Sequence, residues 1–202
     1  MKINEHTKII GDNVILVPFK KCHVETYHKW SQSEEIRDLT GDDPRTLEKE
    51  YERHEKWVAD DDKCTFIILD RAAYEFSKDE VEAMVGETTI YIIDKDVNCV
   101  IGEVEVMIGK ESARRKKYGS EAVILIMLYG IKQISIVSYE ARIATNNEKG
   151  IKLFEKLQFG KVTPYSPYGE FVMEKHVTNE WVDWLKQQCE WHIQSYNKPF
   201  VF

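Results

Sequence analysis

The order of the secondary-structure signals along this 202-residue chain predicts an α/β fold in its α+β mixed-sheet form, with about seven strands in one sheet and helices on both faces. Three observations support this prediction. Apolar runs at 85–93 and 100–108 are joined by a short polar segment, which is typical of an antiparallel hairpin. The later strand signals alternate with helical ones, so they need crossover connections. The segment at 120–131 is apolar on nearly every side, which indicates a helix covered by other elements.

The N-terminal half supplies the first strands and two helices. The first strand, at 13–19, follows a Gly11-Asp12 turn signal, and apolar residues then recur at helical intervals through 23–31 and 47–58. Thr46 is suited to cap the second helix. The next segments are a strand at 64–70, a charged surface excursion at 71–82, and the strands at 85–93 and 100–108 with their hairpin loop at 94–98.

The C-terminal half alternates helices with strands. A basic loop at 114–119 is followed by the apolar helix at 120–131, a strand at 135–144, a helix at 147–157, two closing strands at 159–163 and 171–176, and a tail helix at about 178–196. The tail helix carries Trp181, Trp184 and Trp191. No repeat or Pro/Gly-rich linker interrupts this order, so residues 1–202 are expected to form a single domain.

Composition argues against several classes of protein. The chain has 28 Lys and Arg against 35 Asp and Glu, a net charge of −7, whereas duplex binding usually needs a broad basic surface. The four cysteines lie far apart without a Cys/His pair at metal-ligand spacing, so we expect no metal site. The N-terminal residues lack the apolar core of a signal peptide, and the longest apolar stretch, 122–128, is too short to span a bilayer. We therefore expect a cytoplasmic protein without membrane attachment, with access to the nucleus left open.

The basic loop before the apolar helix is a candidate phosphate site. A helix N-terminus offers unpaired backbone N–H groups and a partial positive charge. The side chains of Arg114, Arg115, Lys116 and Lys117 add four full charges, which suits the pyrophosphate of a nucleotide or of coenzyme A. The segment is neither a Walker loop nor a GxGxxG motif. A solvated basic turn, a localisation signal or a local nucleic-acid patch are the alternatives.

Glu103 and Glu105 are the second candidate site. Two positions apart on a strand, they point to the same face beside Met107, while Val104, Val106 and Ile108 point to the other. Two neighbouring carboxylates raise each other's pKa, as a general base near neutral pH requires. The alternative is an ordinary solvent-facing side of the sheet.

Two motifs of this chain resemble the GNAT N-acetyltransferases, in the branch related to ribosomal-protein N-acetyltransferases. The family's Arg/Gln-x-x-Gly-x-Gly/Ala loop, which binds the acetyl-coenzyme A pyrophosphate, corresponds to 114–119. Its Asn-x-x-Ser-Ile-x-x-x-x-Lys-x-Gly-Phe motif corresponds to 147–159. Separate blocks at 13–18, 27–30, 62–67, 102–108 and 119–123 are further similar to the eukaryotic N-acetyltransferase 9 branch, in the right order along nearly the whole chain.

This resemblance implies the GNAT acyl-CoA N-acyltransferase fold, whose fourth and fifth strands splay apart around the pantetheine arm. It also implies an acetyl-CoA-dependent N-acetyltransferase that acts on a protein N-terminus or a lysine, by direct attack of the amine in a ternary complex. Glu103 is the implied general base, and Glu105 is the alternate base or the anchor of the substrate ammonium. The implied cofactor-binding residues are Met107, Ile108, Arg114, Arg115, Lys116, Lys117, Tyr118, Gly119, Ser120, Asn147 and Phe154.

Two departures from the family pattern bear on this expectation. Lys117 stands where the family loop has its first glycine, which either permits a close backbone approach to the pyrophosphate or adopts a conformation that a side chain resists. Leu153 is followed by Phe154 where many members have a tyrosine that protonates the leaving thiolate. The alternatives are therefore a degenerate acetyl-CoA-binding module without activity, or a protein-interaction module that uses the tryptophan-rich tail. The oligomeric state is left open.

Overall fold

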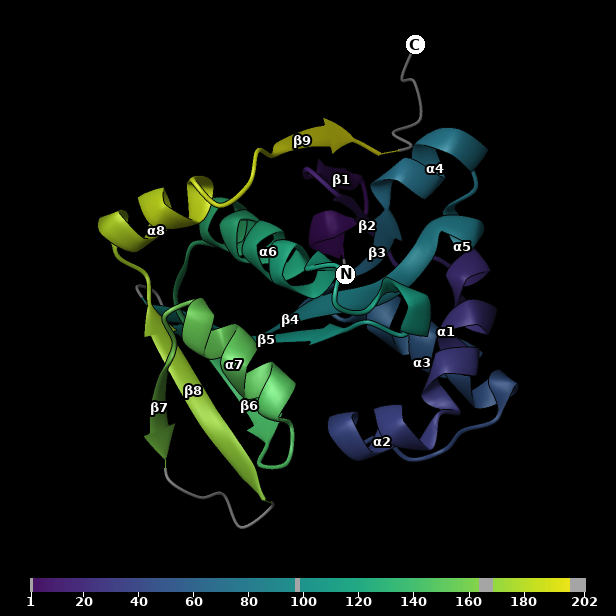
Figure 1. Cartoon of the computed structure of the whole chain (residues 1–202), viewed down its shortest axis with the longest axis horizontal. Coiled ribbons are helices and arrows are strands. Elements are labelled where there is room, and N and C mark those ends of the chain that lie inside the picture. The colour runs from purple at the N-terminus through teal and green to yellow at the C-terminus, as the bar shows by residue number, and fades with distance from the viewer. Residues whose placement is uncertain (1, 97–98, 164–168, 197–202) are drawn as a thin grey trace.

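A computed structural model describes residues 2–96, 99–163 and 169–196 of the chain. In these residues, nine strands form one mixed sheet in the order β7-β8-β6-β5-β4-β3-β2-β1-β9 (Figure 1). The strands are β1 (Thr7–Ile10), β2 (Val14–Pro18), β3 (Lys63–Asp70), β4 (Met84–Asp96), β5 (Cys99–Met107), β6 (Ile136–Ala144), β7 (Gly160–Thr163), β8 (Glu170–His176) and β9 (His192–Ser195). Neighbouring strands are antiparallel except β5 and β6, which run parallel. The predicted mixed α/β sheet is confirmed.

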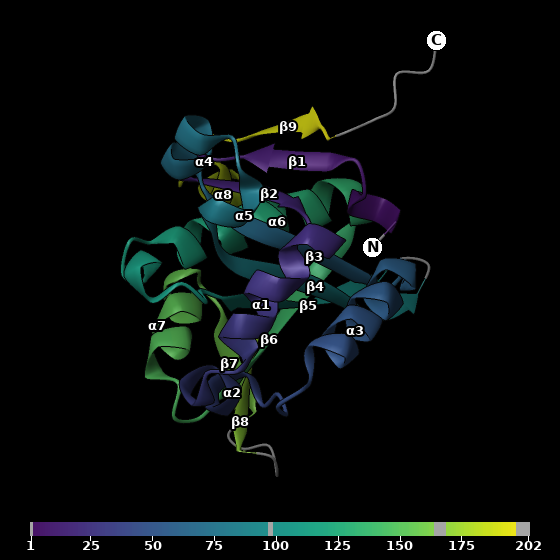
Figure 2. The ribbon, with the colours of Figure 1, turned by 90° about the vertical axis from the view of Figure 1, so that its right-hand side faces the viewer.

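Helices cover both faces of this sheet (Figure 2). They are α1 (Val24–Ser31), α2 (Glu34–Thr40), α3 (Leu47–Ala59), α4 (Arg71–Ser77), α5 (Glu80–Ala83), α6 (Tyr118–Ile134), α7 (Glu148–Lys156) and α8 (Asn179–Lys186), with the 3-10 turns η1 (Lys2–Asn4), η2 (Lys21–His23) and η3 (Glu111–Ala113). Helix α6 lies on one face with α8 beside it, and α1 packs with α3 on the other. In the part of the chain that the structure describes, we find no helix with both the length and the apolar character needed to cross a membrane.

Strand alternation gives the sheet a hydrophobic core on each face. On β3, Phe66 and Ile68 belong to the core under α6, whereas Ile67 and Leu69 belong to the core under α1 and α3. All four side chains are fully buried, because the strand is covered on both sides. Helix α6 is buried continuously through 121–130, which agrees with the prediction of a helix covered by its neighbours.

The parallel pair β5 and β6 separates along its length. The two strands are paired only from Val100 to Glu103 on β5, opposite Ile136 to Glu140 on β6. Beyond Glu103, β5 continues to Met107 in register with β4, but no ladder joins it to β6. The backbone on that edge of β5 is therefore open, as the splay expected from the resemblance requires.

Two expectations about the elements were wrong, and a third, the surface excursion at 71–82, was incomplete. The tail helix does not extend over 178–196: α8 ends at Lys186, and the chain returns as β9, which pairs with β1 at the edge of the sheet. The sheet has two more strands than the seven expected, because β1 and β9 have four residues each and join through backbone hydrogen bonds that side-chain patterning does not reveal. The excursion at 71–82 contains the helices α4 and α5, capped by the side chains of Asp70 and Asp79.

Candidate active site

A cavity of about 170 Å³ occupies the gap between β5 and β6. Glu103, Glu105 and Met107 line it from β5, and Asn147 and Phe154 line it from the N-cap and the buried side of α7. The Asn147 side chain accepts a hydrogen bond of 2.9 Å from the backbone N–H of Gly150, so it caps α7 and fixes this wall. The splay thus brings together five of the residues that the sequence singled out.

The basic loop ends at the N-terminus of α6. Lys117, the residue before the first turn, has a φ of 65°, and Arg115 has the same φ. This left-handed conformation is strained for a residue with a side chain and free for glycine. Of the two reasons for a glycine at position 117, the structure therefore supports the conformational one.

This strain leads to a stability prediction. Replacing Lys117 with Gly should raise the free energy of unfolding by about 1 kcal/mol, because glycine adopts positive φ without the cost that lysine bears. The measurement is the urea midpoint of the variant against that of the parent. Lys116→Gly is the matched control, since Lys116 is not among the positive-φ residues, and it should destabilise slightly. Equal shifts in the two variants would contradict the argument.

Glu121 anchors the first turn of α6 to the start of β2. Its Oε1 accepts hydrogen bonds from the backbone N–H groups of Asn13 at 2.8 Å and Val14 at 3.1 Å, and its Oε2 accepts from Asn13 Nδ2 at 2.8 Å. Gly119 lies against the side chains of Ile108 and Val106 near the end of β5. The helix N-terminus is therefore held rigidly beside the open edge of β5, as an anion site at this position requires.

Some side chains of the basic loop are bound to other parts of the protein, and others are exposed. Arg114 folds back, with Nε donating to the Ile108 carbonyl at 3.2 Å and Nη1 donating to Glu35 of α2 at 2.8 Å. Arg115, Lys116 and Lys117 are exposed. The Tyr118 hydroxyl donates to Asp70 at 2.9 Å, and burial together with this acceptor raises the pKa of Tyr118 to about 12. Ser120 follows in the first turn of α6, partly exposed.

A second cavity, of about 130 Å³, lies on the other side of β5 beneath α1, α2 and α3. It shares Thr40, Glu87, Glu105 and Met107 with the first cavity, so the two spaces meet at these side chains. Acidic groups predominate in its wall, where Asp42 joins the two glutamates and Arg53 is the basic residue. A cavity of this composition favours a cationic ligand.

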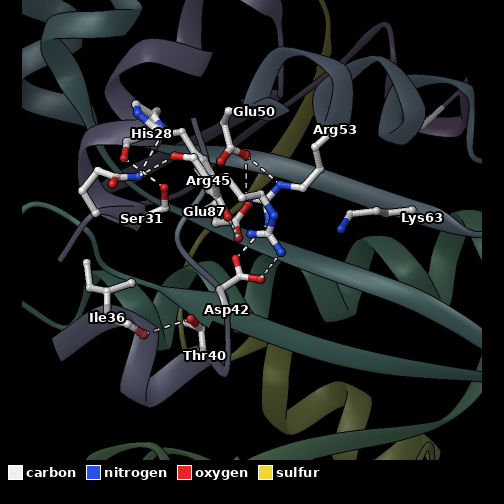
Figure 3. Close-up of polar contacts among 12 residues, drawn as sticks. His28, Ser31, Ile36, Thr40, Asp42, Arg45, Glu50, Arg53, Lys63 and Glu87 are labelled. Atoms are coloured by element: carbon white, nitrogen blue, oxygen red, sulfur yellow. Dashed lines mark hydrogen bonds and ion pairs between the residues drawn. The ribbon is translucent and has the colours of Figure 1, made fainter. Parts of the chain in front are cut away.

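A network of charged and aromatic groups supports the second cavity, and Figure 3 shows Arg53 with the carboxylates of Glu50 and Asp42. Arg53 lies between two carboxylates, with Nη2 2.6 Å from Glu50 and Nη1 2.9 Å from Asp42. Lys63 donates to the Tyr91 hydroxyl at 2.5 Å and lies over the ring of Trp57, 3.2 Å from its centroid. Burial lowers the pKa of Lys63 to about 8. These partners hold Arg53 at the cavity wall and Lys63 against Trp57 and Tyr91, which line the cavity.

The two candidate glutamates on β5 differ in their surroundings. Glu103 accepts a hydrogen bond of 2.8 Å from Nε of Arg142 on β6, an ion pair across the mouth of the splay. Glu105 forms no ion pair with the described residues, and its side chain is open to both cavities. Desolvation and the charges of Glu87 and Glu103 raise the pKa of Glu105 to about 7. Of the two, Glu105 has the properties of a base at neutral pH.

Glu87 is a residue at the site that the sequence argument did not single out. It lies on β4 directly opposite Met107, on the same face as Glu105, and lines both cavities. Its strand reads Val-Gly-Glu-Thr-Thr, in which a carboxylate stands on a face that is buried along the neighbouring strands. A charged residue at an inward position of a buried strand was the signal that could have identified it.

One group of side chains in the described residues is clustered closely enough to hold a metal ion. Ligand atoms of Cys22, His23 and Glu80 lie within 4.8 Å of one another. However, Nδ1 of His23 accepts the backbone N–H of Lys20 at 3.1 Å, so the neutral ring carries its proton on Nε2, which faces Glu80 at 3.2 Å. A metal-bound imidazole normally donates from its second nitrogen. The donor set therefore fits a hydrogen-bonded chain, which the Tyr196 hydroxyl extends by donating to Glu80.

Comparison with known proteins gives a consistent family match. A family model described as an acetyltransferase (GNAT) domain matches residues 13–160. The alpha/beta-tubulin-N-acetyltransferase 9 of Drosophila melanogaster is 37% identical over 199 residues, covering 97% of this chain and 100% of the relative. An N-acetyltransferase 9-like protein of Caenorhabditis briggsae is 42% identical over 179 residues, covering 86% of this chain and 88% of the relative.

The fold also matches solved structures. The spermidine N-acetyltransferase of Vibrio cholerae, solved in complex with CoA and spermine, superimposes with a TM-score of 0.67 at 13% identity. The match covers 84% of this chain and 98% of that one. At this identity the likeness is one of fold alone.

Proposed function

The chain belongs to the GNAT acetyltransferase family and, within it, to the N-acetyltransferase 9 branch, and we propose that it moves an acetyl group from acetyl-CoA to the α-amino group of a protein. It is an N-acetyltransferase. The observation that carries the proposal is the position of Glu105, a carboxylate whose pKa is raised to about 7 where the two cavities meet.

The residues present fit acetyl-CoA. The open edge of β5 beyond Glu103 offers backbone groups to a pantetheine arm, in the manner of an added strand. The α6 N-terminus, with Arg115, Lys116 and Lys117 exposed before it, suits the pyrophosphate. When bound, acetyl-CoA supplies the acetyl carbon and a thiolate leaving group. The main chain near Met107 would then be the part of β5 that orients the acetyl carbonyl oxygen.

The proposed reaction is a direct attack by the amine, with the chain's residues handling its proton. The second cavity holds the amine among Asp42, Glu87 and Glu105. Glu105 takes a proton from the nitrogen, so that its lone pair is free to bond with the acetyl carbon. Since the amine attacks directly, no covalent enzyme nucleophile is needed. Burial raises the pKa of the Cys64 thiol to about 12, which makes it a poor nucleophile.

The ordinary pKa values of the two kinds of amine favour an α-amine over a lysine. Removing the proton from an α-amine of pKa about 8 costs about 3 kcal/mol less than removing it from a lysine of pKa about 10.4, whichever base accepts the proton. The difference of about 3 kcal/mol corresponds to more than a hundredfold in rate when proton transfer limits the reaction.

The relatives suggest which protein provides the amine. The Drosophila relative is named for acetylation of α- and β-tubulin, and its match covers nearly the whole of both chains. The acidic second cavity is compatible with the cationic N-terminus of a tubulin chain. We therefore propose tubulin N-termini as acceptors.

The proposal predicts selective turnover. With acetyl-CoA, the protein should acetylate a peptide carrying the free N-terminus of α-tubulin at least about a hundred times faster than the same peptide blocked at its N-terminus and carrying an internal lysine. Mass spectrometry locates the added acetyl group. Faster transfer to lysine would overturn the α-amine assignment. Binding of acetyl-CoA without any turnover would instead favour the degenerate module.

A further inference from the structure

Glu87 carries a buried carboxylate oxygen without a protein partner. Its Oε1 accepts a hydrogen bond from the Tyr27 hydroxyl at 3.3 Å, whereas Oε2 is buried and has no hydrogen-bond partner among the described residues. The two cations behind it are engaged elsewhere, since Arg53 pairs with Glu50 and Asp42 and Lys63 donates to Tyr91. A buried carboxylate oxygen normally accepts at least one hydrogen bond. A donor that enters the cavity can therefore complete this one.

We infer that Glu87 binds the acceptor amine through Oε2, accepting one of its N–H groups while Glu105 removes the proton from another. This inference rests on the amine acetylation proposed above and adds the residue that orients the amine. It assigns the two carboxylates different tasks at one nitrogen. Glu103, which is paired with Arg142, takes no part in the pair.

The sheet register supports this arrangement. Glu87 lies opposite Met107, and Glu105 lies opposite Thr89, in the antiparallel ladder of β4 and β5. The two glutamates are therefore diagonal neighbours on one face, with β-carbons less than about 7–8 Å apart. That spacing lets two carboxylates contact one nitrogen from different sides. Both also line the two cavities, at the place where an amine would meet an acetyl group.

The surrounding groups hold Glu87 for this task. The hydrogen bond from Tyr27 fixes Oε1, and this leaves Oε2 as the free acceptor. Burial raises the pKa of Glu87, and the charges of Lys63 and Arg53 oppose that shift, so the carboxylate is poorly solvated but electrostatically supported. A donor on the incoming amine stabilises its charged form.

The proton count of the reaction specifies the kind of amine. Glu105 takes the first proton from the primary ammonium, which leaves a neutral amine with its lone pair and two hydrogens on nitrogen. As the C–N bond forms and the C–S bond breaks, the electron pair of the broken bond leaves on sulfur, one of these hydrogens leaves as the proton that the thiolate takes up, and the other stays on nitrogen and donates to Glu87. A neutral secondary amine has a single hydrogen, which must leave, so no N–H group remains for Glu87. Glu87 therefore makes the site selective for primary amines.

The deciding experiment measures peptide binding in the absence of acetyl-CoA. Calorimetry compares a peptide with the free N-terminus of α-tubulin and the same peptide N-acetylated, for the parent, Glu87→Leu and Glu87→Gln. The parent should prefer the free amine by about ten- to a hundredfold, as expected for a hydrogen bond to a charged group. Glu87→Leu should lose most of this preference, and Glu87→Gln, which keeps an acceptor oxygen, should retain part of it. An unchanged preference in Glu87→Leu, with native melting behaviour, would overturn the inference.

Turnover separates this inference from the proposed function. With acetyl-CoA, the parent should acetylate the primary amine at least about tenfold faster than the N-methylated peptide, and Glu87→Leu should narrow that ratio. If the parent acetylates neither peptide but its binding preference depends on Glu87, the proposed function fails and the inference stands. If the parent and both Glu87 variants prefer the free over the N-acetylated peptide equally in binding, and the primary over the N-methylated amine equally in turnover, the inference fails and the proposed function stands.

Discussion

Replacing Glu105 with Gln is expected to lower kcat/KM for acetyl transfer about a hundred- to a thousandfold, because it removes the base that takes the amine proton. Affinity for acetyl-CoA should change little, since the lost group lies where the two cavities meet and away from the phosphate loop. Glu103→Gln is the matched comparison: it removes the same charge two residues earlier, from a carboxylate held by Arg142. Its effect on turnover should stay below about tenfold. Equal losses in the two variants would contradict the assignment of the base to Glu105.

The pH dependence provides a second readout for Glu105. The parent's rate should rise through an apparent pKa of about 7, whereas Glu105→Gln should show only the titration of the amine.

The contribution of Glu105 to the stability of the parent should change with pH in the opposite sense. The native pKa lies above the ordinary 4.5, so the native state holds the proton longer than the unfolded chain, and this group's contribution to stability falls as pH rises from about 4.5 to about 7. Urea midpoints should therefore favour Glu105→Gln over the parent at about pH 8.

The faces of β5 could be predicted from the sequence, but the difference between its two glutamates could not. A period of two places Glu103, Glu105 and Met107 together, and the structure puts Val104 in the core under α6 as expected. The position of Arg142 depends on how β6 pairs with β5, which is a tertiary property. The same splay that opens the cavity leaves Arg142 within reach of Glu103 and leaves Glu105 without such a partner.

For the basic loop, too, the sequence predicted one part of the site and not another. The composition of the basic loop and its place before an apolar helix predicted an anion site. The structure places the start of that helix, α6, at Tyr118. The pairing of Arg114 with Glu35 could not be anticipated, because 79 positions separate the two residues and α2 was not predicted at all. Helix α2 has seven residues and one buried side chain, Ile36, so it offers too few apolar positions for a periodic signal.

Reversing the charges of Arg114 and Lys117 is expected to weaken acetyl-CoA binding about a hundredfold or more, because charge-assisted hydrogen bonds to phosphate are lost and like charges face the ligand. Calorimetry on the Arg114→Glu/Lys117→Glu double variant gives the affinity. The parent's affinity should fall as salt is raised, and the variant's should depend on salt less. Lys49→Glu/Lys56→Glu changes the net charge equally on exposed positions of α3 and should leave the affinity nearly unchanged.

A single substitution on α2 is expected to strengthen acetyl-CoA binding, whereas the double variant weakens it. In this structure Glu35 holds Nη1 of Arg114 at 2.8 Å, so this carboxylate competes with the phosphates for the guanidinium. Glu35→Gln should release Arg114 and tighten acetyl-CoA binding by up to about fivefold, the range expected for an exposed ion pair. A pantetheine fragment without phosphates should bind the parent, the double variant and Glu35→Gln alike. If its affinity falls with that of acetyl-CoA in the double variant, the loop acts by shaping the β5 edge, and the assignment of the phosphates to the α6 N-terminus is wrong.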